Sequence, residues 1–289
     1  MMQIMKILKQ KSVLPLMWVL TSVALIWSCT ENPFSDNIFS GGDGQNFSGT
    51  VQLENSADPS GVFVWLEAFN LKTTTDKDGK FSFKLPPRQQ SHPGGGLTGY
   101  YTIYFYVENY DVLSVRIFLF DGAIDYAKSG LDSDGRFKAK IGLRKLLNIH
   151  SYLDTLQMRN INYPGLIIST DLSSVHSDAL TITTTLLRGG GWASVLLHKQ
   201  GTPKDSLIII DQGGFLGAVH VFDPQKLSLY IPTGSVVLNP GVYFPIPFLY
   251  LERDLPTGLI DALGHEKRTL STAFLQLPIR LNISPFIIK

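Results

Sequence analysis

The sequence predicts an all-β protein built from two β-sandwich domains in tandem. Hydrophobic residues make up 44% of the chain, which is enough for a substantial core. From position 46 onward the apolar residues come in short runs, many of them β-branched or aromatic, separated by Pro and Gly. No segment shows the 3.6-residue period of a helix three turns long. Short strands at regular spacing, with turn signals between them, are typical of sandwiches and barrels.

Residues 1–28 have the pattern of a signal peptide. Lys6, Lys9 and Lys11 form a positive start, and the fifteen residues from position 13 to position 27 carry no charge. Such a run matches the apolar segment of a signal peptide and falls short of the ~20 residues that span a membrane. We therefore expect this segment to be removed.

The end of this segment, Ile26-Trp-Ser-Cys29, resembles the lipobox of bacterial lipoproteins, although Trp27 is larger than the usual occupant of its position. The resemblance implies that Cys29 is lipidated and anchors the mature chain to a membrane. Cys29 is the only cysteine, so no internal disulfide competes for it. The alternative is an N-terminal anchor helix with an incidental cysteine. Thr30 is not the aspartate that often retains lipoproteins at the inner membrane, so the resemblance implies the outer membrane, facing either side.

Residues 29–45 are rich in Gly, Asp, Asn and Ser, and this composition predicts a flexible tether. A flexible chain of this length reaches roughly 20–25 Å on average. After removal of the signal peptide, 22 basic residues face 24 acidic ones, and no basic run stands out. A nucleic-acid partner requires a positive footprint, so the charge pattern argues against one.

Two segments with the pattern Asp-x-Asp-Gly raise the question of a calcium site. They are "TTTDKDGKFSF" at 73–83 and "DSDGRF" at 132–137. An EF-hand loop needs glycine at its sixth position and glutamate at its twelfth. Counted from Asp76, glycine is fourth and the twelfth residue is Pro87. Neither segment therefore fits an EF-hand.

A β-hairpin explains the first segment better. Asp76 can cap the turn with its own carboxylate, and Gly79 can take the positive φ that the turn needs. Phe81 and Phe83 then fall on one face of the returning strand. A calcium site of irregular spacing in the loop at 121–135 stays open as an alternative, with these candidate ligands: Asp121, Asp125, Asp132 and Asp134.

The stretch from Asn46 to Phe120 resembles the carboxypeptidase regulatory-like domain, a transthyretin-type module. The resemblance rests on Gly49-Thr-Val51, Gly61-Val62, Thr75-Asp-x-Asp-Gly-x-Phe81, Leu85-Pro-Pro87 and Asn109-Tyr110. It implies a Greek-key sandwich over residues 46–149 that acts in scaffolding, adhesion or assembly and has no catalytic residues. The chain departs from the family in a long loop at 88–99.

The second domain is expected over residues 150–289. Its runs "DALTITTTLL", "SLIIID", "GSVVLNPGVYFPIPF" and "RDLPTGL" faintly resemble the Ig-like domain of bacterial proteinase inhibitors. The resemblance implies a second Greek-key or Ig-like sandwich and, as an alternative function, inhibition of a periplasmic protease. The Pro and Gly positions independently indicate turns between strands.

Sequence motifs for catalysis are missing. No histidine has a glutamate three residues later, and there is no Gly-x-Ser-x-Gly elbow. His220 and Asp223 lie three residues apart, which places them on opposite faces of a strand. We therefore expect neither enzymatic activity nor a cofactor or resident metal, with a hydrolase of unrecognised type as the less favoured alternative.

The strand "YYTIYFYVENY" offers candidate binding residues. Thr102, Tyr104 and Tyr106 share one face, while Ile103 and Phe105 share the other with Val107. Tyr104 and Tyr106 could form a platform for a protein or carbohydrate partner. Alternatively these tyrosines pack against the second domain.

Together these observations predict a lipid-anchored cell-envelope protein with a non-enzymatic binding, adhesion or scaffold role. A periplasmic protease inhibitor or an accessory in envelope assembly is the alternative.

Overall fold

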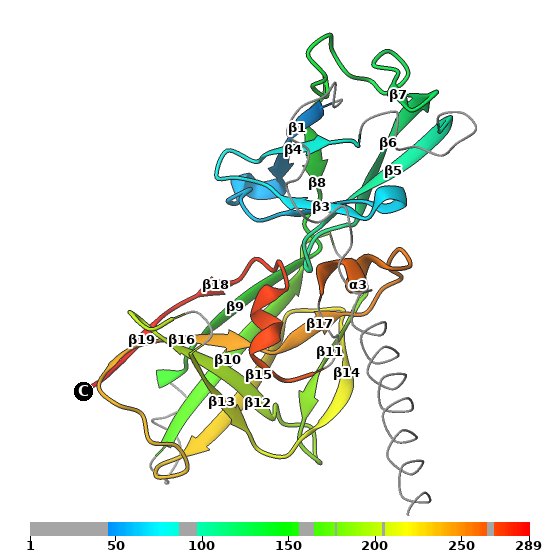
Figure 1. Cartoon of the computed structure of the whole chain (residues 1–289). Coiled ribbons are helices and arrows are strands. Elements are labelled where there is room, and N and C mark those ends of the chain that lie inside the picture. The colour runs from blue at the N-terminus through cyan, green and yellow to red at the C-terminus, as the bar shows by residue number, and fades with distance from the viewer. Residues whose placement is uncertain (1–45, 87–96, 156–164, 177, 204–205, 265–268) are drawn as a thin grey trace, which may run out of the picture. The chain divides into compact units, whose positions relative to one another are not determined.

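The computed structural model describes residues 46–86, 97–155, 165–176, 178–203, 206–264 and 269–289 (Figure 1). The predicted signal peptide, Cys29 and nearly all of the long loop at 88–99 lie outside these residues. The chain from Asp43 to Lys289 forms one compact unit. Within the described residues, no helix is both long and apolar enough to cross a membrane.

The first half of this unit, residues 46–146, is a two-layered β-structure. Its described strands are β1 (Asn46–Leu53), β2 (Phe63–Leu66), β3 (Leu71–Thr74), β4 (Lys80–Lys84), β5 (Gly99–Tyr106), β6 (Leu113–Phe120), β7 (Ala123–Ile124) and β8 (Ile141–Leu143). Two short 3-10 turns, η1 (Glu54–Ser56) and η2 (Glu67–Phe69), follow β1 and β2. The strands form two sheets, in the orders β4-β1-β8 and β3-β2-β5-β6-β7.

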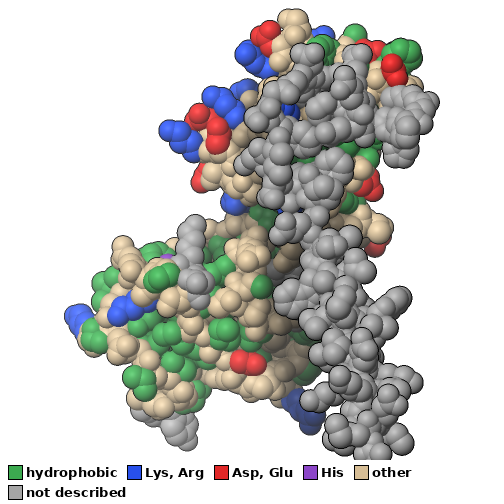
Figure 2. Space-filling model, in the orientation of Figure 1, with side chains coloured by type: hydrophobic (Ala, Val, Ile, Leu, Met, Phe, Trp, Pro, Cys, Tyr) green, Lys and Arg blue, Asp and Glu red, His purple; other side chains and the backbone are tan. Residues whose placement is uncertain are grey.

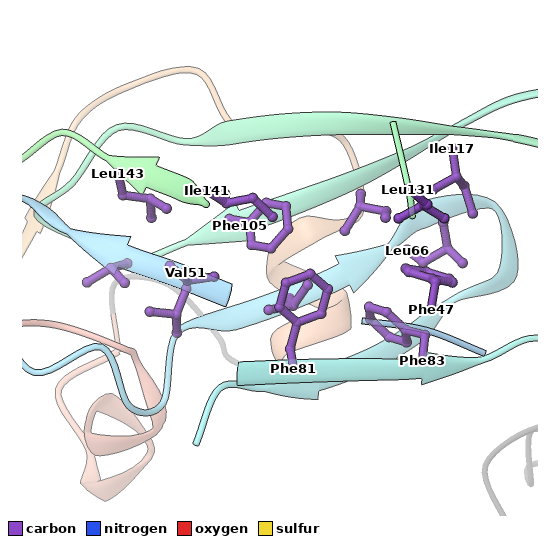
Figure 3. Close-up of a cluster of buried hydrophobic side chains, with 14 of the residues drawn as sticks. Phe47, Val51, Leu66, Phe81, Phe83, Phe105, Ile117, Leu131, Ile141 and Leu143 are labelled. Atoms are coloured by element: carbon purple, nitrogen blue, oxygen red, sulfur yellow. The ribbon is translucent and has the colours of Figure 1, made fainter. Parts of the chain in front are cut away.

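Apolar side chains from both sheets form one core between them (Figure 3). Phe81 and Phe83 enter it from β4, as predicted, and Phe105 enters it from β5. The rings of Phe81 and Phe105 meet edge to face with centroids 5.2 Å apart. Burying each such side chain stabilises the fold by about 1.5–3 kcal/mol.

The second half, residues 147–289, adds three more sheets. Its described strands are β9 (Leu147–Leu153), β10 (Gly165–Ser174), β11 (Leu180–Leu186), β12 (Ser194–Lys199), β13 (Leu207–Asp211), β14 (Phe215–Val221), β15 (Gln225–Pro232), β16 (Gly241–Pro247), β17 (Leu249–Leu251), β18 (Asn282–Ile283) and β19 (Phe286–Ile288). The described helical pieces are α3 (Leu259–Leu263) and η4 (Thr272–Gln276). The sheet orders are β15-β10-β9-β18, β14-β11-β17 and β13-β12-β16-β19.

The predicted all-β class is confirmed. The expected domain boundary between residues 149 and 150 falls inside β9, which pairs with β10 and β18 of the second half. A further apolar cluster joins the halves, because Phe63 and Trp65 of β2 pack with Phe248 and Tyr250. The division into two domains therefore stays a prediction, with β9 belonging to the second half.

The first Asp-x-Asp-Gly segment forms the predicted turn but not the predicted hairpin. Asp76 Oδ1 accepts the backbone N–H groups of Asp78 (2.9 Å) and Lys80 (2.8 Å), and Gly79 has a φ of +75°. However, β3 and β4 belong to different sheets. The carbonyl oxygen of Gly79 accepts the N–H of Val51 at 2.8 Å, so the chain leaves the turn alongside β1.

The second segment repeats this geometry. Asp132 Oδ1 accepts the N–H groups of Asp134 (2.9 Å) and Arg136 (2.8 Å), and Gly135 has a φ of +76°. The carbonyl oxygen of Gly135 accepts the N–H of Ser48 at 2.9 Å. Both turns therefore dock on β1 through the carbonyl of their glycine.

Candidate binding site

The outward surface of β5 and β6 carries the residues from which a site can be built. Side chains alternate along a strand, so Ile103 of β5 points into the core while Thr102 and Tyr104 point outward, as predicted. In β6, Arg116 and Phe118 point outward for the same reason. The register places Tyr100 opposite Phe118 and Thr102 opposite Arg116.

Tyr106 lies at the end of this surface that the second half covers. Its side chain is fully buried and packs in the cluster that contains Phe248 and Tyr250. Its hydroxyl group donates a hydrogen bond to the carboxylate of Glu108. Burial, and then the charge of Glu108, raise the pKa of Tyr106. Tyr106 therefore offers no surface to a ligand, and the alternative of packing against the second half describes it correctly.

Tyr104 occupies an intermediate position on the same surface. It is half-buried and stacks on Trp65, with ring centroids 5.8 Å apart and an interplanar angle of 27°. Trp65 Nε1 donates to Asn70 Oδ1 at 3.1 Å, which fixes the indole ring. Partial burial, followed by the charge of Glu67, raises the pKa of Tyr104. Tyr104 remains a candidate at the margin of a site.

The opposite end of the surface is open and aromatic. Tyr100 is 56% exposed and Phe120 is 63% exposed. The rings of Tyr100 and Phe118 meet at 64° with centroids 4.9 Å apart. We call this region the aromatic face and define it by Tyr100, Arg116, Phe118, Phe120 and Lys128.

Two cations lie over the rings of the aromatic face. The Arg116 guanidinium is 5.2 Å from the centre of the Tyr100 ring, and Lys128 Nζ is 4.4 Å from the centre of the Phe118 ring. Each such contact stabilises by about 0.5–1 kcal/mol at an exposed position. The loop after β7 holds Lys128 there, because Ser129 Oγ accepts the N–H of Phe118 at 2.8 Å.

Sequence reasoning named Tyr104 and Tyr106 as a candidate platform, with packing against the second domain as the alternative, and the structure buries Tyr106 in that alternative way. Tyr100 has the same strand parity as Tyr104 and Tyr106, and "LSVRIFLF" alternates Arg116 and Phe118 with core residues. These signals identify the outward surface. The sequence does not tell which end the second half covers.

Two of the four candidate aspartates of the loop at 121–135, Asp125 and Asp132, cap its backbone. Asp125 Oδ1 accepts the N–H of Lys128 at 3.0 Å, and Asp132 caps the turn described above. Asp134 Oδ2 lies 3.5 Å from Arg136 Nη1. Across the ranges that the structure describes, no three His, Cys, Asp or Glu side chains gather in a way that could hold a metal ion.

A polar hollow of about 920 Å³ lies beside β1. Its lining residues are Ser48, Gly49, Thr50, Thr73, Thr74, Thr75, Asp76, Lys80, Phe81, Ser82, Arg136 and Phe137. Lys80 Nζ lies 3.4 Å from Asp78 Oδ2, so this cation, like Arg136, already has an acidic neighbour. The hollow thus presents hydroxyl groups and paired charges.

A buried acid, Asp154, lies beside a lysine in the second half. Lys226 Nζ lies 3.1 Å from Asp154 Oδ2, and Ser169 Oγ donates to the same oxygen at 3.2 Å. Hydrogen bonds to Tyr152 and Asp154 raise the pKa of Lys226. The three side chains thus form a hydrogen-bonded ion pair in which Ser169 and Lys226 both donate to Asp154.

No family model and no curated protein matches this chain, so neither family resemblance is confirmed. Among solved structures, a candidate carbohydrate-binding protein from Bacteroides uniformis ATCC 8492 is 10% identical, with coverage of 69% of this chain and 86% of that chain and a TM-score of 0.29. The shaft pilin SpaA from Lactobacillus rhamnosus GG, as its D295N mutant, is 11% identical, with coverage of 74% and 90% and a TM-score of 0.30. A DUF3823 family protein from Bacteroides ovatus ATCC 8483 is 9% identical, with coverage of 72% and 94% and a TM-score of 0.27. Because all three TM-scores lie below 0.5, we take neither ligand nor partner from them.

Proposed function

We propose that this protein is a lipid-anchored binding protein of the bacterial outer membrane and that it has no catalytic activity. The proposed binding role rests on the exposed aromatic face. Exposed clusters of aromatic side chains are uncommon on a surface that contacts only water, and they mark interaction sites. Aromatic residues and arginine are also the types enriched at interfaces.

The chemistry of the aromatic face indicates what it binds. The rings of Tyr100 and Phe120 can cover the apolar side of a sugar ring or of a partner's side chain. Arg116 and Thr102 lie opposite each other on the same surface and add hydrogen-bond donors. We therefore propose a carbohydrate or a protein of the cell surface as the partner.

Location follows from the N-terminal resemblance to a lipobox. Lipidation at Cys29 would hold the folded unit at the membrane, and the tether at 29–45 would give it a reach of roughly 20–25 Å. Such an arrangement serves capture of a partner close to the membrane.

The test is a binding screen of the mature chain carrying Cys29→Ser, which leaves out the lipid. The probes are an array of bacterial and host glycans and a set of purified envelope proteins. We expect at least one ligand whose binding falls tenfold or more in Tyr100→Ser, since truncating an aromatic anchor of a binding site costs on the order of 2 kcal/mol.

Phe222→Ser is the matched control, because Phe222 is 64% exposed but lies in the second half between β14 and β15. Binding should be unchanged in this variant. Equal loss in both variants, or no ligand in either set of probes, would contradict the proposal.

A further inference from the structure

The polar hollow beside β1 lies between the edges of two strands that belong to different sheets. Among the described strands, β3 ends one sheet and β4 ends the other, and the turn from Asp76 to Gly79 joins them. Residues of both strands line the hollow of about 920 Å³, among them Thr74 of β3 and Ser82 of β4. The hollow is therefore a slot between two strand edges, and it shares no residue with the aromatic face.

The backbone of β4 has a free edge at the slot. In an antiparallel pair of strands, residues that exchange hydrogen bonds alternate with residues whose N–H and C=O groups point away from the partner strand. Val51 N–H donates to the carbonyl of Gly79 at 2.8 Å, so the alternation turns the backbones of Ser48 and Ser82 away from each other. Ser48 N–H donates to Gly135, on the other side of β1, at 2.9 Å. The N–H and C=O of Ser82 therefore point to the open edge of β4, where the described residues provide no partner.

The backbone of β3 has a free edge on the opposite wall. Thr75 N–H donates to the carbonyl of Val62 at 3.1 Å, and the register of β2 and β3 continues this alternation. The N–H and C=O groups of Lys72 and Thr74 therefore point away from β2. Of these groups, the carbonyl of Thr74 accepts Thr73 Oγ1 at 3.5 Å. Both walls thus offer main-chain donors and acceptors, which is what the addition of a strand to a sheet edge requires.

The side chains of β4 specify the pattern of a strand that would pair with it. Phe81 and Phe83 point into the core, and Phe81 also lines the slot. Lys80, Ser82 and Lys84 alternate with them and point outward. Paired strands share the same two faces, so an added strand places apolar side chains beside the phenylalanines and polar ones beside the lysines. The slot is thus matched to an extended segment that alternates apolar and polar residues.

A second copy of β4 is a poor occupant of this edge. Antiparallel self-pairing centred on Ser82 would place Lys80 of each copy opposite Lys84 of the other. Like charges directly opposite each other destabilise a strand pair. Lysines on a strand edge are also a common protection against pairing between copies. The edge therefore disfavours its own copy and favours a strand with acidic side chains at these two positions.

The charges around the slot agree with an acidic partner. The charged residues that line it are one acid, Asp76, and two cations, Lys80 and Arg136. Asp76 Oδ1 already accepts two N–H groups of its own turn. Each cation pairs with an exposed aspartate of a neighbouring turn, and surface pairs of this kind are weak enough for an incoming carboxylate to compete. Figure 2 shows Lys and Arg side chains beside Asp and Glu side chains over the first half.

We propose that this slot binds an extended acidic segment of a partner protein, which pairs with β4 as an added strand. Main-chain hydrogen bonds to Ser82 supply affinity, and carboxylates beside Lys80 and Lys84 supply specificity. The site is additional to the aromatic face and does not depend on it.

The probe is a fluorescein-labelled peptide, Thr-Glu-Val-Thr-Val-Glu-Thr, whose two glutamates are spaced as Lys80 and Lys84 are. Its pattern is the same in both directions, so it fits β4 in either orientation. The mature chain carrying Cys29→Ser is titrated into the peptide, and fluorescence anisotropy gives the dissociation constant. We expect saturable binding. A peptide with lysine in place of both glutamates should bind about tenfold or more weakly, because it repeats the charge of the edge.

Ser82→Pro tests the main-chain hydrogen bond. Proline at this position removes the N–H that faces the slot and leaves the ladder with β1 in place. It should raise the dissociation constant of the glutamate peptide by about tenfold or more, whereas Ser82→Ala keeps the N–H and should change it by less than about twofold. Tyr100→Ser alters only the aromatic face and should bind the peptide as the wild type does. Circular dichroism verifies that each variant is folded.

A charge reversal tests the specificity without changing the backbone. The double variant Lys80→Glu and Lys84→Glu should prefer the lysine peptide over the glutamate peptide by about tenfold or more. Binding of the glutamate peptide that is absent or unsaturable would overturn the proposal. So would an equal effect of Ser82→Pro and Ser82→Ala, or an unchanged preference in the charge-reversed variant.

Discussion

At the scale of single residues, the two Asp-x-Asp-Gly turns depend on their glycines for two reasons. Gly79 and Gly135 both have positive φ, which favours glycine. In addition, a Cβ atom at Gly79 would lie 2.3 Å from the carbonyl oxygen of Val51, and one at Gly135 would lie 2.5 Å from that of Asn46. The roles of the aspartate and the glycine in each turn could be predicted from the sequence, because the hydrogen bonds that close the turn are local. The contact with β1 could not, since it joins segments far apart in the sequence.

Gly79→Ala and Gly135→Ala should each destabilise the protein by about 2–4 kcal/mol, from left-handed strain together with displacement of β1. Gly61→Ala is the control, because Gly61 has a φ of +66° but nothing lies within 4 Å of its Cβ position. It should cost only about 1–2 kcal/mol. Urea unfolding measures all three. Equal losses would show that contact with β1 contributes nothing.

Tyr106 makes stability sensitive to alkaline pH. Its pKa is raised in the folded state, whereas the unfolded side chain ionises near pH ~10. Above that pH only the unfolded state releases this proton, so the stability that Tyr106 contributes is present below pH ~10 and is lost as the pH rises. Above pH ~10 the free energy of unfolding falls by about 1.4 kcal/mol per pH unit. Tyr106→Phe should show a correspondingly smaller slope in urea unfolding between about pH 9 and pH 11. Identical slopes would mean that Tyr106 ionises as readily when folded.

At the scale of elements, the alternation along β4, β5 and β6 could be read from the sequence, but strand pairing could not. Because side chains alternate between the two faces of a strand, Phe81, Phe83 and Phe105 can be assigned to the core whichever strands lie next to them. It does not specify that β4 pairs with β1. For the same reason, the outward surface of β5 was predictable, whereas the burial of Tyr106 under the second half was only one of two alternatives.

The turn after β5 is held by an arginine from the second half. Arg253 donates hydrogen bonds to the carbonyl oxygens of Val107 (3.2 Å), Glu108 (2.9 Å) and Tyr110. We expect Arg253→Met to destabilise the protein by about 3–5 kcal/mol, because these carbonyls would lose a charged donor.

Arg136→Met is its control, since the Arg136 side chain is exposed and forms a surface ion pair with Asp134. Surface pairs of this kind contribute about 0–1 kcal/mol. Chemical denaturation compares the two variants. A small effect at Arg253 would show that the turn keeps its conformation without the guanidinium.

At the scale of the whole molecule, composition and strand spacing predict the all-β class correctly, because patterning reports burial along the entire chain. Function is less accessible to such reasoning. The aromatic face, which we propose as a binding site, combines side chains of two strands and one loop at the end of the surface where Tyr100 and Phe120 are exposed. The role of Cys29 rests on a resemblance and lies outside the described residues.

The membrane anchor predicts a chemical label. Cells fed radioactive palmitate should label the wild-type protein and not Cys29→Ala, because the chain has no other cysteine. Label that persists in the variant would exclude lipidation at this position. Immunoblotting of both proteins ensures that the loss is not a loss of expression.

The aromatic face as a binding surface is tested most directly by saturation binding to intact cells of the bacterium that makes the protein. Fluorescent mature chain carrying Cys29→Ser is compared with the same chain carrying Tyr100→Ser and Phe120→Ser, and with the Phe222→Ser control. We expect saturable binding by the wild type and the control, with a dissociation constant about tenfold or more higher in the double variant. Binding that is unsaturable, absent, or equal in all three proteins would contradict the assignment of this surface.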